Sequence, residues 1–303
     1  MTEYLMAEAL EGGHDCVVTI GGVQSNHCRA TAAAARLVGM DPHLVLLVRD
    51  AHADDDPGLQ GNLLINRFLG AQLHLCRASD YVRYGADLNA LNRINQIVAA
   101  RLVREGRTPY IIPVGGTTPM AAWGYINAVA ELREQLGLGD VGGKCPFDHI
   151  VFPVGSGGTA TGMALGCRLS QTSAQLHGVS VHHTPEHFYK LIDAEADALG
   201  HTSGSARDWL HIHCGAGAGY GVSTPALMRF CAETARQSGV LVDHVYSGKC
   251  LYHFCEYARQ HPDLFRGARI LFWHTGGALA LYSQQEEVLS TMPAGQVQRV
   301  QLE

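Results

Sequence analysis

Lysine is scarce in this sequence of 303 residues, and arginine supplies nearly all of its positive charge. The only lysines are Lys144, Lys190 and Lys249. The formal net charge is −6, so the chain has no excess of positive charge that would attract a nucleic acid or an anionic membrane surface. We therefore expect neither as a partner.

Paired cysteines, long apolar runs and a secretory signal are also missing. The nine cysteines form no C-x-x-C pair, and several lie in apolar segments, which predicts reduced and mostly buried thiols. No run of eighteen apolar residues is present, so we expect no membrane span. The first residues, MTEYLMAEALEGG, lack a basic and apolar leader and have a helical pattern instead.

Short apolar runs rich in β-formers alternate with helical patterns along the whole chain. Such alternation predicts an α/β fold in which parallel sheets are covered by helices on both faces. We place two parallel-sheet units at about residues 12–118 and 145–303, and divide the chain into a smaller domain, 1–130, and a larger domain, 131–303. The predicted strands lie in CVVTIGG, HLVLLVRD, QLHLC, PYIIPVGG, DHIVFPVG, VSVHH, LHIHCG and ILFWHTGG, and the helical patterns cover 27–38, 58–69, 86–104 and 119–136.

Four of these strands end in polar turns that contain glycine: GGVQSNH, PVGGTT, PVGSGGTATG and HTGG. In an open parallel sheet, ligands bind in the crevice beyond the carboxyl ends of the strands. The repetition of this pattern favours one shared site over four unrelated loops.

The segment from Phe152 to Gly166, FPVGSGGTATGMALG, is the most specific of these turns. Its glycines allow close approach, its amides and the following helix start converge, and Ser156 and Thr159 add hydroxyl donors, which suits a phosphate dianion. A purely structural turn is the alternative. A Walker A loop is excluded because no lysine follows the last glycine, and the spacing fits a dinucleotide fingerprint poorly.

The other polar turns have both structural and functional interpretations. Ser25 or Asn26 can cap the following helix without any ligand. Tyr246 can be a half-buried structural phenol, and Lys249 a solvated residue at a helix start. The hydroxyl of Thr275 can simply close a turn. The histidine clusters HHTPEH and HIHC lack the spacing of known metal sites, so we expect no metal.

Six segments together resemble the D-cysteine desulfhydrase and 1-aminocyclopropane-1-carboxylate deaminase family, and the resemblance covers essentially the whole chain in order. The forms GVQSNH, VYSGK and HTGG are closer to the desulfhydrase branch. The resemblance implies the pyridoxal-phosphate fold of tryptophan synthase β. The segments are GGVQSNHCRATAAAARLVGM, DPGLQGNLLINRFLGAQLHL, PYIIPVGGTTPMAAWGYINAVAEL, VFPVGSGGTATG, LVDHVYSGK and LFWHTGGALALYS.

The resemblance also implies roles for individual residues. Asn26 would bond the phenolate oxygen of pyridoxal 5′-phosphate, and Ser25 with the adjoining amides, including His27, would receive the substrate carboxylate. Thr275 would lie near the pyridine nitrogen, and Tyr246 would handle a proton at the substrate. The loop that would hold the cofactor phosphate comprises Gly155, Ser156, Gly157, Gly158 and Thr159.

The sequence departs from the family pattern at two places. Family members carry the Schiff-base lysine in a GNK-type segment just before the helix that here is TEYLMAEAL, which puts that lysine upstream of Met1. His244 stands where proline is usual. We therefore expect an N-terminally truncated fold and a chain that is inactive as given, because it lacks the amine that attaches the cofactor.

The implied reaction is elimination from D-cysteine to pyruvate, sulfide and ammonia. The alternatives are a pseudoenzyme that binds pyridoxal phosphate or an amino acid without turnover, and a 1-aminocyclopropane-1-carboxylate deaminase. The expected partners are a small amino-acid substrate and a second copy in a homodimer. The expected location is the cytoplasm or an organelle, since an upstream targeting segment would not be visible in this sequence.

Overall fold

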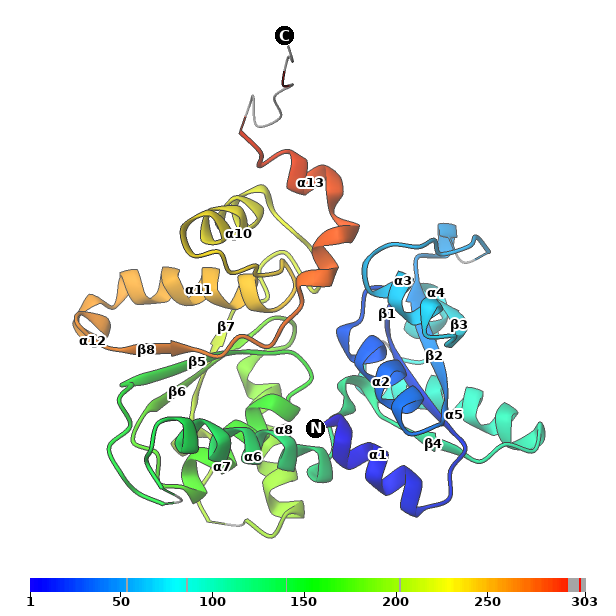
Figure 1. Ribbon diagram of the computed structural model, residues 1–303, viewed down its shortest axis with the longest axis horizontal. Helices are drawn as coiled ribbons and strands as arrows, with labels where there is room; N and C mark the ends of the chain where they lie inside the picture. The colour runs from blue at the N-terminus through cyan, green and yellow to red at the C-terminus, as the bar shows by residue number, and fades with distance from the viewer. Residues whose placement is uncertain (53, 86, 140, 202, 294–299, 301–303) are drawn as a thin grey trace.

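The structure is a computed structural model that describes residues 1–303 apart from 53, 86, 140, 202, 294–299 and 301–303. The described residues form two units that lie side by side, each built on a parallel four-stranded sheet (Figure 1). Each of the eight predicted segments contains residues of a strand, but the one at VSVHH is misplaced: the strand runs over Gln175–Ser180 and shares only Val179 and Ser180 with the prediction. The α/β prediction with parallel sheets is therefore confirmed.

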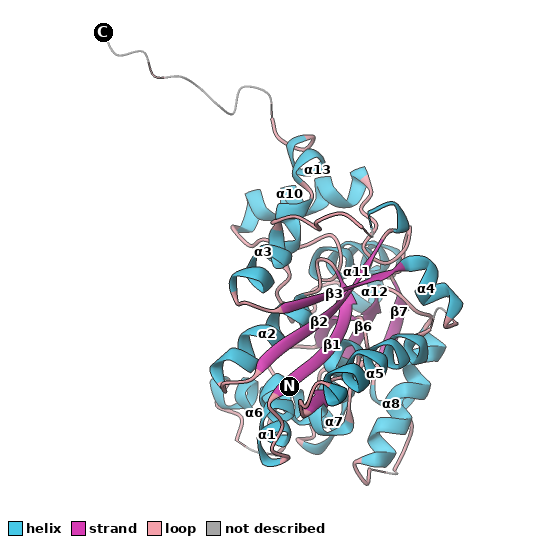
Figure 2. Cartoon of the chain, turned by 90° about the vertical axis from the view of Figure 1, so that its right-hand side faces the viewer, coloured by secondary structure: helices cyan, strands magenta, loops and turns pink. Residues whose placement is uncertain are grey.

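The first unit has the strand order β3-β2-β1-β4. Alternate residues of β1 point to opposite faces. Val17 packs with Leu5 and Met40 on one face, while Val18 packs with Ile94 on the other. Figure 2 shows α5 across one face and α1 and α2 across the opposite one. The strands are β1 (Cys16–Gly22), β2 (Asp41–Val48), β3 (Gln72–Arg77) and β4 (Pro109–Ile111), and the helices are α1 (Thr2–Glu11), α2 (Asn26–Leu37), α3 (Gly61–Phe68), α4 (Ala78–Arg83) and α5 (Leu88–Arg104).

The second unit has the strand order β7-β6-β5-β8. Phe152 of β5 packs toward α7 and α8, whereas Val151 packs toward α11, so this sheet is also the middle of three layers. The strands are β5 (His149–Val154), β6 (Gln175–Ser180), β7 (His211–Cys214) and β8 (Ile270–Phe272), and the helices are α6 (Pro119–Gln135), α7 (Gly158–Leu169), α8 (Pro185–Ala198), α9 (Ala206–Trp209), α10 (Pro225–Ser238), α11 (Ser247–Gln260), α12 (Pro262–Phe265) and α13 (Gln285–Leu289). Short 3-10 helices are η1 (Asp50–His52), η2 (Val114–Gly116) and η3 (Ala278–Ser283).

Helix α6 connects the two sheets and packs closely on α7. A Cβ atom on Gly162 would lie 2.5 Å from the backbone oxygen of Ala122, and one on Gly166 would lie 2.9 Å from Cβ of Val129. Glycine at these positions lets the two helices approach each other. The predicted division at residue 130 falls inside α6 and stays a prediction.

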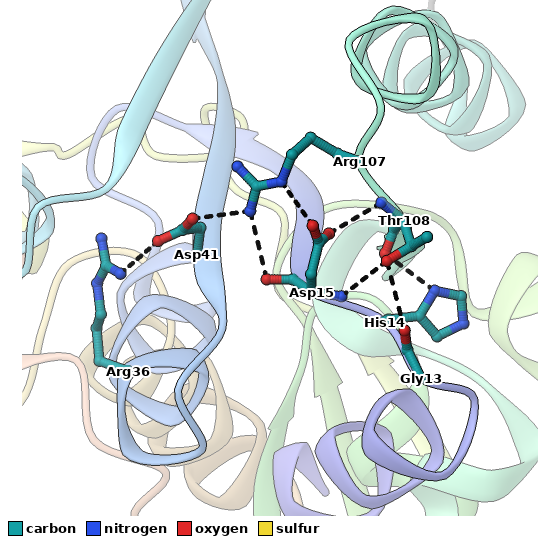
Figure 3. Close-up of polar contacts among 7 residues, drawn as sticks. All are labelled: Gly13, His14, Asp15, Arg36, Asp41, Arg107 and Thr108. Carbon is teal, nitrogen blue, oxygen red and sulfur yellow. Dashed lines mark hydrogen bonds and ion pairs between the residues drawn. The ribbon is translucent and has the colours of Figure 1, made fainter.

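The amino ends of the first sheet are tied together by one arginine (Figure 3). Arg107 donates to Oδ2 of Asp15 and to Oδ2 of Asp41, each at 2.7 Å, and Arg36 reaches Asp41 Oδ1 at 2.7 Å. These hydrogen bonds from Arg107 and Arg36 hold the pKa of Asp41 below its ordinary value.

Candidate active site

The loops that follow β1, β4, β5 and β7 meet at the carboxyl edges of the two sheets. Thr117, in the loop after β4, donates to Oγ of Ser156, in the loop after β5, at 2.8 Å. Gly155 lies against the ring of Tyr246, so that a Cβ atom there would be 2.7 Å from Cε1 of the tyrosine. The structure therefore brings together turns that are far apart in the sequence.

The start of α7 has the features of an anion site. Helix α7 begins after Gly157, whose φ is 108°, and no side chain caps it. Side-chain caps are present at α2, α5, α6, α8 and α10, whereas α1, α3 and α4 lack one as α7 does. The first-turn amides of α7 thus point to the loop without a side-chain acceptor, which favours a bound anion.

Asn26, the first residue of α2, is held by a second asparagine. Asn62 is fully buried, and its Nδ2 donates to Oδ1 of Asn26 at 2.8 Å and to the backbone oxygen of Gln24 at 2.9 Å. Oδ1 of Asn62 accepts from Nε of Arg29 at 3.0 Å. Since the oxygen of the Asn26 amide is occupied, its Nδ2 group is the part available to donate to a ligand.

Ser25 and His27 flank Asn26 and have structural partners. Oγ of Ser25 accepts from the backbone N of Cys28 at 3.1 Å, so the N-cap interpretation holds. Nε2 of His27 lies 2.8 Å from Oγ1 of Thr19, which itself donates to a backbone oxygen, so the histidine is the donor. Burial lowers the pKa of His27 to about 4, which keeps the ring neutral at pH 7. Substrate binding by Ser25, Asn26 and His27 stays a prediction.

Tyr246 lies at the start of α11 and pairs with Tyr220. The two phenolic oxygens are 2.6 Å apart. Burial raises the pKa of Tyr246 well above its ordinary value, and desolvation of its hydroxyl raises the pKa of Tyr220, although 43% of that residue is exposed. Both phenols are therefore protonated at neutral pH and share one short hydrogen bond.

Asp243 fixes the start of α11. Its carboxylate accepts from the backbone N of Val245, Tyr246 and Ser247 at 3.0, 2.9 and 2.7 Å. A Cβ atom on Gly277 would lie 2.6 Å from Oδ1 of Asp243, so this carboxylate also packs on the turn that carries Thr275. Thr275 itself is exposed, and its role beside the cofactor ring stays a prediction.

Lys249 is not a solvated residue at a helix start. It lies in the first turn of α11, is 1% exposed, and donates to the backbone oxygens of Ala216 and Gly219 at 3.3 and 2.6 Å. The solvated interpretation was wrong because the loop at 215–221 folds over the side chain.

Sequence reasoning missed Asn62, Tyr220 and Thr117. Each acts through a partner at least 26 positions away, at Asn26, Tyr246 and Ser156. Only Tyr220 had a local signal, since it is the single large side chain in the glycine-rich run GAGAGYG.

The histidines form contacts with one another. His177 lies between His149 and His213, with nitrogen–nitrogen distances of 3.0 and 2.9 Å, which leave no room for an ion between the rings. In the part of the chain that the structure describes, no group of three histidine, cysteine or acidic side chains is arranged to hold a metal. Within the same residues, no helix is long and apolar enough to cross a bilayer.

A comparison with known protein families identifies the class to which the chain belongs. The model of the family described as pyridoxal-phosphate dependent enzyme matches residues 1–276. The chain belongs to this family, and its cofactor is pyridoxal phosphate. Homologous members act as lyases and deaminases.

Relatives narrow the class further. The chain is 41% identical over 290 residues to the mitochondrial bifunctional D-cysteine desulfhydrase/1-aminocyclopropane-1-carboxylate deaminase of Arabidopsis thaliana, covering 96% of this chain and 70% of that protein. It is 31% identical over 292 residues to a D-cysteine desulfhydrase of Yersinia pestis, covering 94% and 83%. These relatives confirm the family resemblance.

Solved structures agree with the fold. The crystal structure of an ACC deaminase homologue superposes with a TM-score of 0.80 at 31% identity, covering 96% of this chain and 82% of that one. A hydrogen sulfide-producing enzyme from Fusobacterium nucleatum, at 14% identity and a TM-score of 0.60, has the same fold and covers 92% and 85%.

The residues present fit the cofactor. The uncapped start of α7 matches its phosphate dianion. The free Nδ2 of Asn26 matches an anionic ring oxygen, and the paired phenols of Tyr220 and Tyr246 stand beside the same loop. Hydroxyl, amide and phenol groups of this kind are the donors that an anionic cofactor requires.

Proposed function

We propose that the protein is a D-cysteine desulfhydrase-like lyase that uses pyridoxal phosphate to convert D-cysteine to pyruvate, sulfide and ammonia. The observation that carries the proposal is the hydrogen-bonded pair Tyr220–Tyr246 packed against Gly155 of the loop at 155–159. Two relatives whose names include D-cysteine desulfhydrase support this choice of substrate.

Different residues of the chain bind different parts of the cofactor and the substrate. The amides of Gly157, Gly158 and Thr159, with the hydroxyl of Ser156, hold the phosphate at the start of α7. Asn26 donates to the ring oxygen through Nδ2. The substrate carboxylate binds at the start of α2, where the amides of Asn26 and His27 lie in the first turn.

When bound, the cofactor supplies the electron sink for loss of the substrate α-proton. In the longer chain, the upstream lysine would accept this α-proton. The C–S bond would break with its electron pair leaving on sulfur, and water would hydrolyse the resulting enamine to pyruvate and ammonia. Tyr246, whose phenol is protonated at neutral pH, gives or holds a proton next to the substrate, and Tyr220 stabilises the charge on its oxygen through the 2.6 Å bond. Thr275, a neutral hydroxyl, leaves the ring nitrogen unprotonated.

The attachment of the cofactor is a separate part of the proposal. Lys144 and Lys190 are exposed, and Lys249 donates to two backbone oxygens. None of the three is set to attach the cofactor, so we propose that these 303 residues alone turn over D-cysteine slowly or not at all. A longer chain that carries the family's GNK-type segment upstream is the matched comparison.

We also propose an oligomeric state and a location for the protein. The protein forms a homodimer, which light scattering measures directly, and it functions in the cytoplasm or in an organelle. The mitochondrial relative from a plant is consistent with the second possibility.

The test is sulfide release from D-cysteine, with L-cysteine, D-serine and β-chloro-D-alanine as comparison substrates, for the 303-residue chain and the longer chain. We expect release by the longer chain, with D-cysteine preferred over L-cysteine. Release of ammonia and 2-oxobutyrate from 1-aminocyclopropane-1-carboxylate, without sulfide from D-cysteine, would make it a deaminase instead. Binding of the cofactor by both chains without any turnover would make it a pseudoenzyme.

A further inference from the structure

Few backbone hydrogen bonds order the loop at 215–221: Gly215 N donates to Ser180 O at 2.8 Å, and Gly219 N donates to Ala216 O at 3.0 Å. Four of its seven residues are glycine, and Gly217, Gly219 and Gly221 have φ values of 54°, 125° and 69°. Glycines lose the most conformational freedom on ordering, so a loop of this composition is costly to fix in one conformation. Tyr220 is nevertheless placed with its hydroxyl 2.6 Å from that of Tyr246.

Two side chains of α11 lie under this loop. Lys249 donates to the backbone oxygens of Ala216 and Gly219, and the second of these residues directly precedes Tyr220. His253, one helical turn further, packs on the same loop, since a Cβ atom on Gly217 would lie 3.2 Å from its Nε2. Lys249 therefore holds the loop at two backbone oxygens three residues apart.

The same helix start carries Tyr246, three residues before Lys249. Tyr246 is the N-cap residue of α11 and accepts from the backbone N of Cys250 at 2.8 Å, and Asp243 fixes the turn through three backbone amides. The position of Tyr246 and the position of the Lys249 ammonium are thus set together. Fixing the loop to Lys249 fixes Tyr220 relative to Tyr246.

We propose that Lys249 is a positioning residue that clamps the loop at 215–221 and thereby places the hydroxyl of Tyr220 against that of Tyr246. This inference rests on the proposed function for its catalytic consequence, but the clamp itself is a property of the protein without cofactor. Burial lowers the pKa of Lys249, as expected for an amine enclosed by a loop. Its hydrogen bonds to backbone oxygens offset the loss of hydration.

The first test is hydrogen exchange of the cofactor-free protein, followed by mass spectrometry of the peptide covering 214–224. The Lys249→Met change removes all three donors and keeps an apolar stem. We expect exchange in this peptide to rise by roughly tenfold or more, as for loss of hydrogen bonds to a charged group, while β5 and β6 stay protected. Unchanged exchange in 214–224 would overturn the clamp. Lys190→Met, at an exposed lysine of α8, is the matched control.

A second measurement keeps the inference testable if Lys249→Met does not fold. The chain has three lysines, so 15N-labelled lysine side chains give three ammonium signals by NMR. We expect slow exchange with water for Lys249 and fast exchange for Lys144 and Lys190. Fast exchange of all three would mean that the ammonium does not hold the loop.

The catalytic part is tested by a double-mutant cycle with Tyr220→Phe, measured as sulfide release by the longer chain. If Lys249 acts through Tyr220, then Lys249→Met lowers kcat in the unsubstituted protein but adds little in the Tyr220→Phe background, and KM changes less than kcat. Equal effects in both backgrounds would overturn the link to Tyr220. Absence of sulfide from the unsubstituted longer chain would contradict the proposed function instead, and the exchange experiment would still decide the clamp.

Discussion

Asn62 holds Asn26 in one orientation: Nδ2 of the first donates to Oδ1 of the second at 2.8 Å. The remaining capacity of the Asn62 amide is used by Gln24 and Arg29, so the side chain is satisfied although it is fully buried. Because its Oδ1 is held, Asn26 at the start of α2 presents its Nδ2 group as a donor in one direction at the edge of the sheet.

Replacing Asn62 with leucine removes these bonds and leaves Oδ1 of Asn26 and the Arg29 side chain without their partner. We expect a loss of about 2 to 3 kcal/mol in unfolding free energy, since a buried group loses its hydrogen bonds. The affinity for pyridoxal phosphate should fall as well, because Asn26 is free to rotate. Urea unfolding and a cofactor titration measure the two effects.

Asn66 provides the matched control on the same helix, α3. It is also fully buried, but among the described residues neither Oδ1 nor Nδ2 of its side chain has a hydrogen-bond partner. Asn66→Leu should therefore be neutral or stabilising by about 1 kcal/mol, with cofactor affinity unchanged. Equal losses for both variants would refute the specific role of Asn62.

Gly157 is expected to be essential for the loop at 155–159. Alanine there must adopt a φ of 108°, and its Cβ atom would lie 2.0 Å from Cδ2 of Leu191. We predict weaker binding of pyridoxal phosphate by Gly157→Ala, together with a loss of about 1 to 3 kcal/mol in stability. Gly106→Ala meets only the backbone cost, since nothing lies within 4 Å of its Cβ position, and should leave binding intact. A Gly157 variant with unchanged affinity would argue against a phosphate at α7.

Tyr246→Phe keeps the ring against Gly155 and removes the hydroxyl. If the phenol handles a proton, kcat for sulfide release by the longer chain should fall by roughly a hundredfold. Thermal stability should change little because the packing of the ring is retained. A normal kcat would assign Tyr246 the structural role that its burial alone suggests.

The contacting histidines His149, His177 and His213 predict that the protein loses stability in acid. Burial first, and then the neighbouring histidines, lower the pKa of His177 to about 3 and that of His213 to about 4. Because both lie below the unfolded value of ~6.5, the folded state binds fewer protons. This contribution to stability is complete above pH ~6.5 and is lost as the pH falls toward 3, at up to ~1.4 kcal/mol per pH unit for each group.

His177→Leu should flatten this dependence, as measured by urea unfolding between pH 7.5 and 5. The substitution removes the central titrating group. It should also lower the unfolding free energy modestly at pH 7.5, since His149 and His213 lose a partner. His52→Gln changes a histidine whose side chain is 68% exposed and should leave the pH dependence as it is. If the unfolding free energy of His177→Leu still falls steeply with pH, other groups cause the acid sensitivity.

The sequence predicted the scaffold because its signals are local. Each strand left an apolar run, and α2, α3, α5 and α6 left helical patterns, whereas α8, α10 and α11 were not among the predicted helices. A cap at Ser25 or Asn26 was expected from residue type, and the structure has it at Ser25. Asn62 and Tyr220 were not predicted because their roles depend on partners 36 and 26 positions away. The burial of Lys249 depends on a loop that begins 34 residues earlier, at Gly215, and no local pattern contains that information.

The most direct measurement is the absorbance spectrum of the 303-residue chain mixed with pyridoxal phosphate, before and after borohydride, with peptide mapping of its three lysines. We expect saturable binding that Gly157→Ala weakens, with no cofactor fixed to Lys144, Lys190 or Lys249. The longer chain should fix the cofactor at the upstream lysine and release sulfide from D-cysteine. Cofactor fixed to Lys249 by borohydride, with turnover of D-cysteine by the 303-residue chain, would contradict this expectation and make Lys249 a catalytic residue.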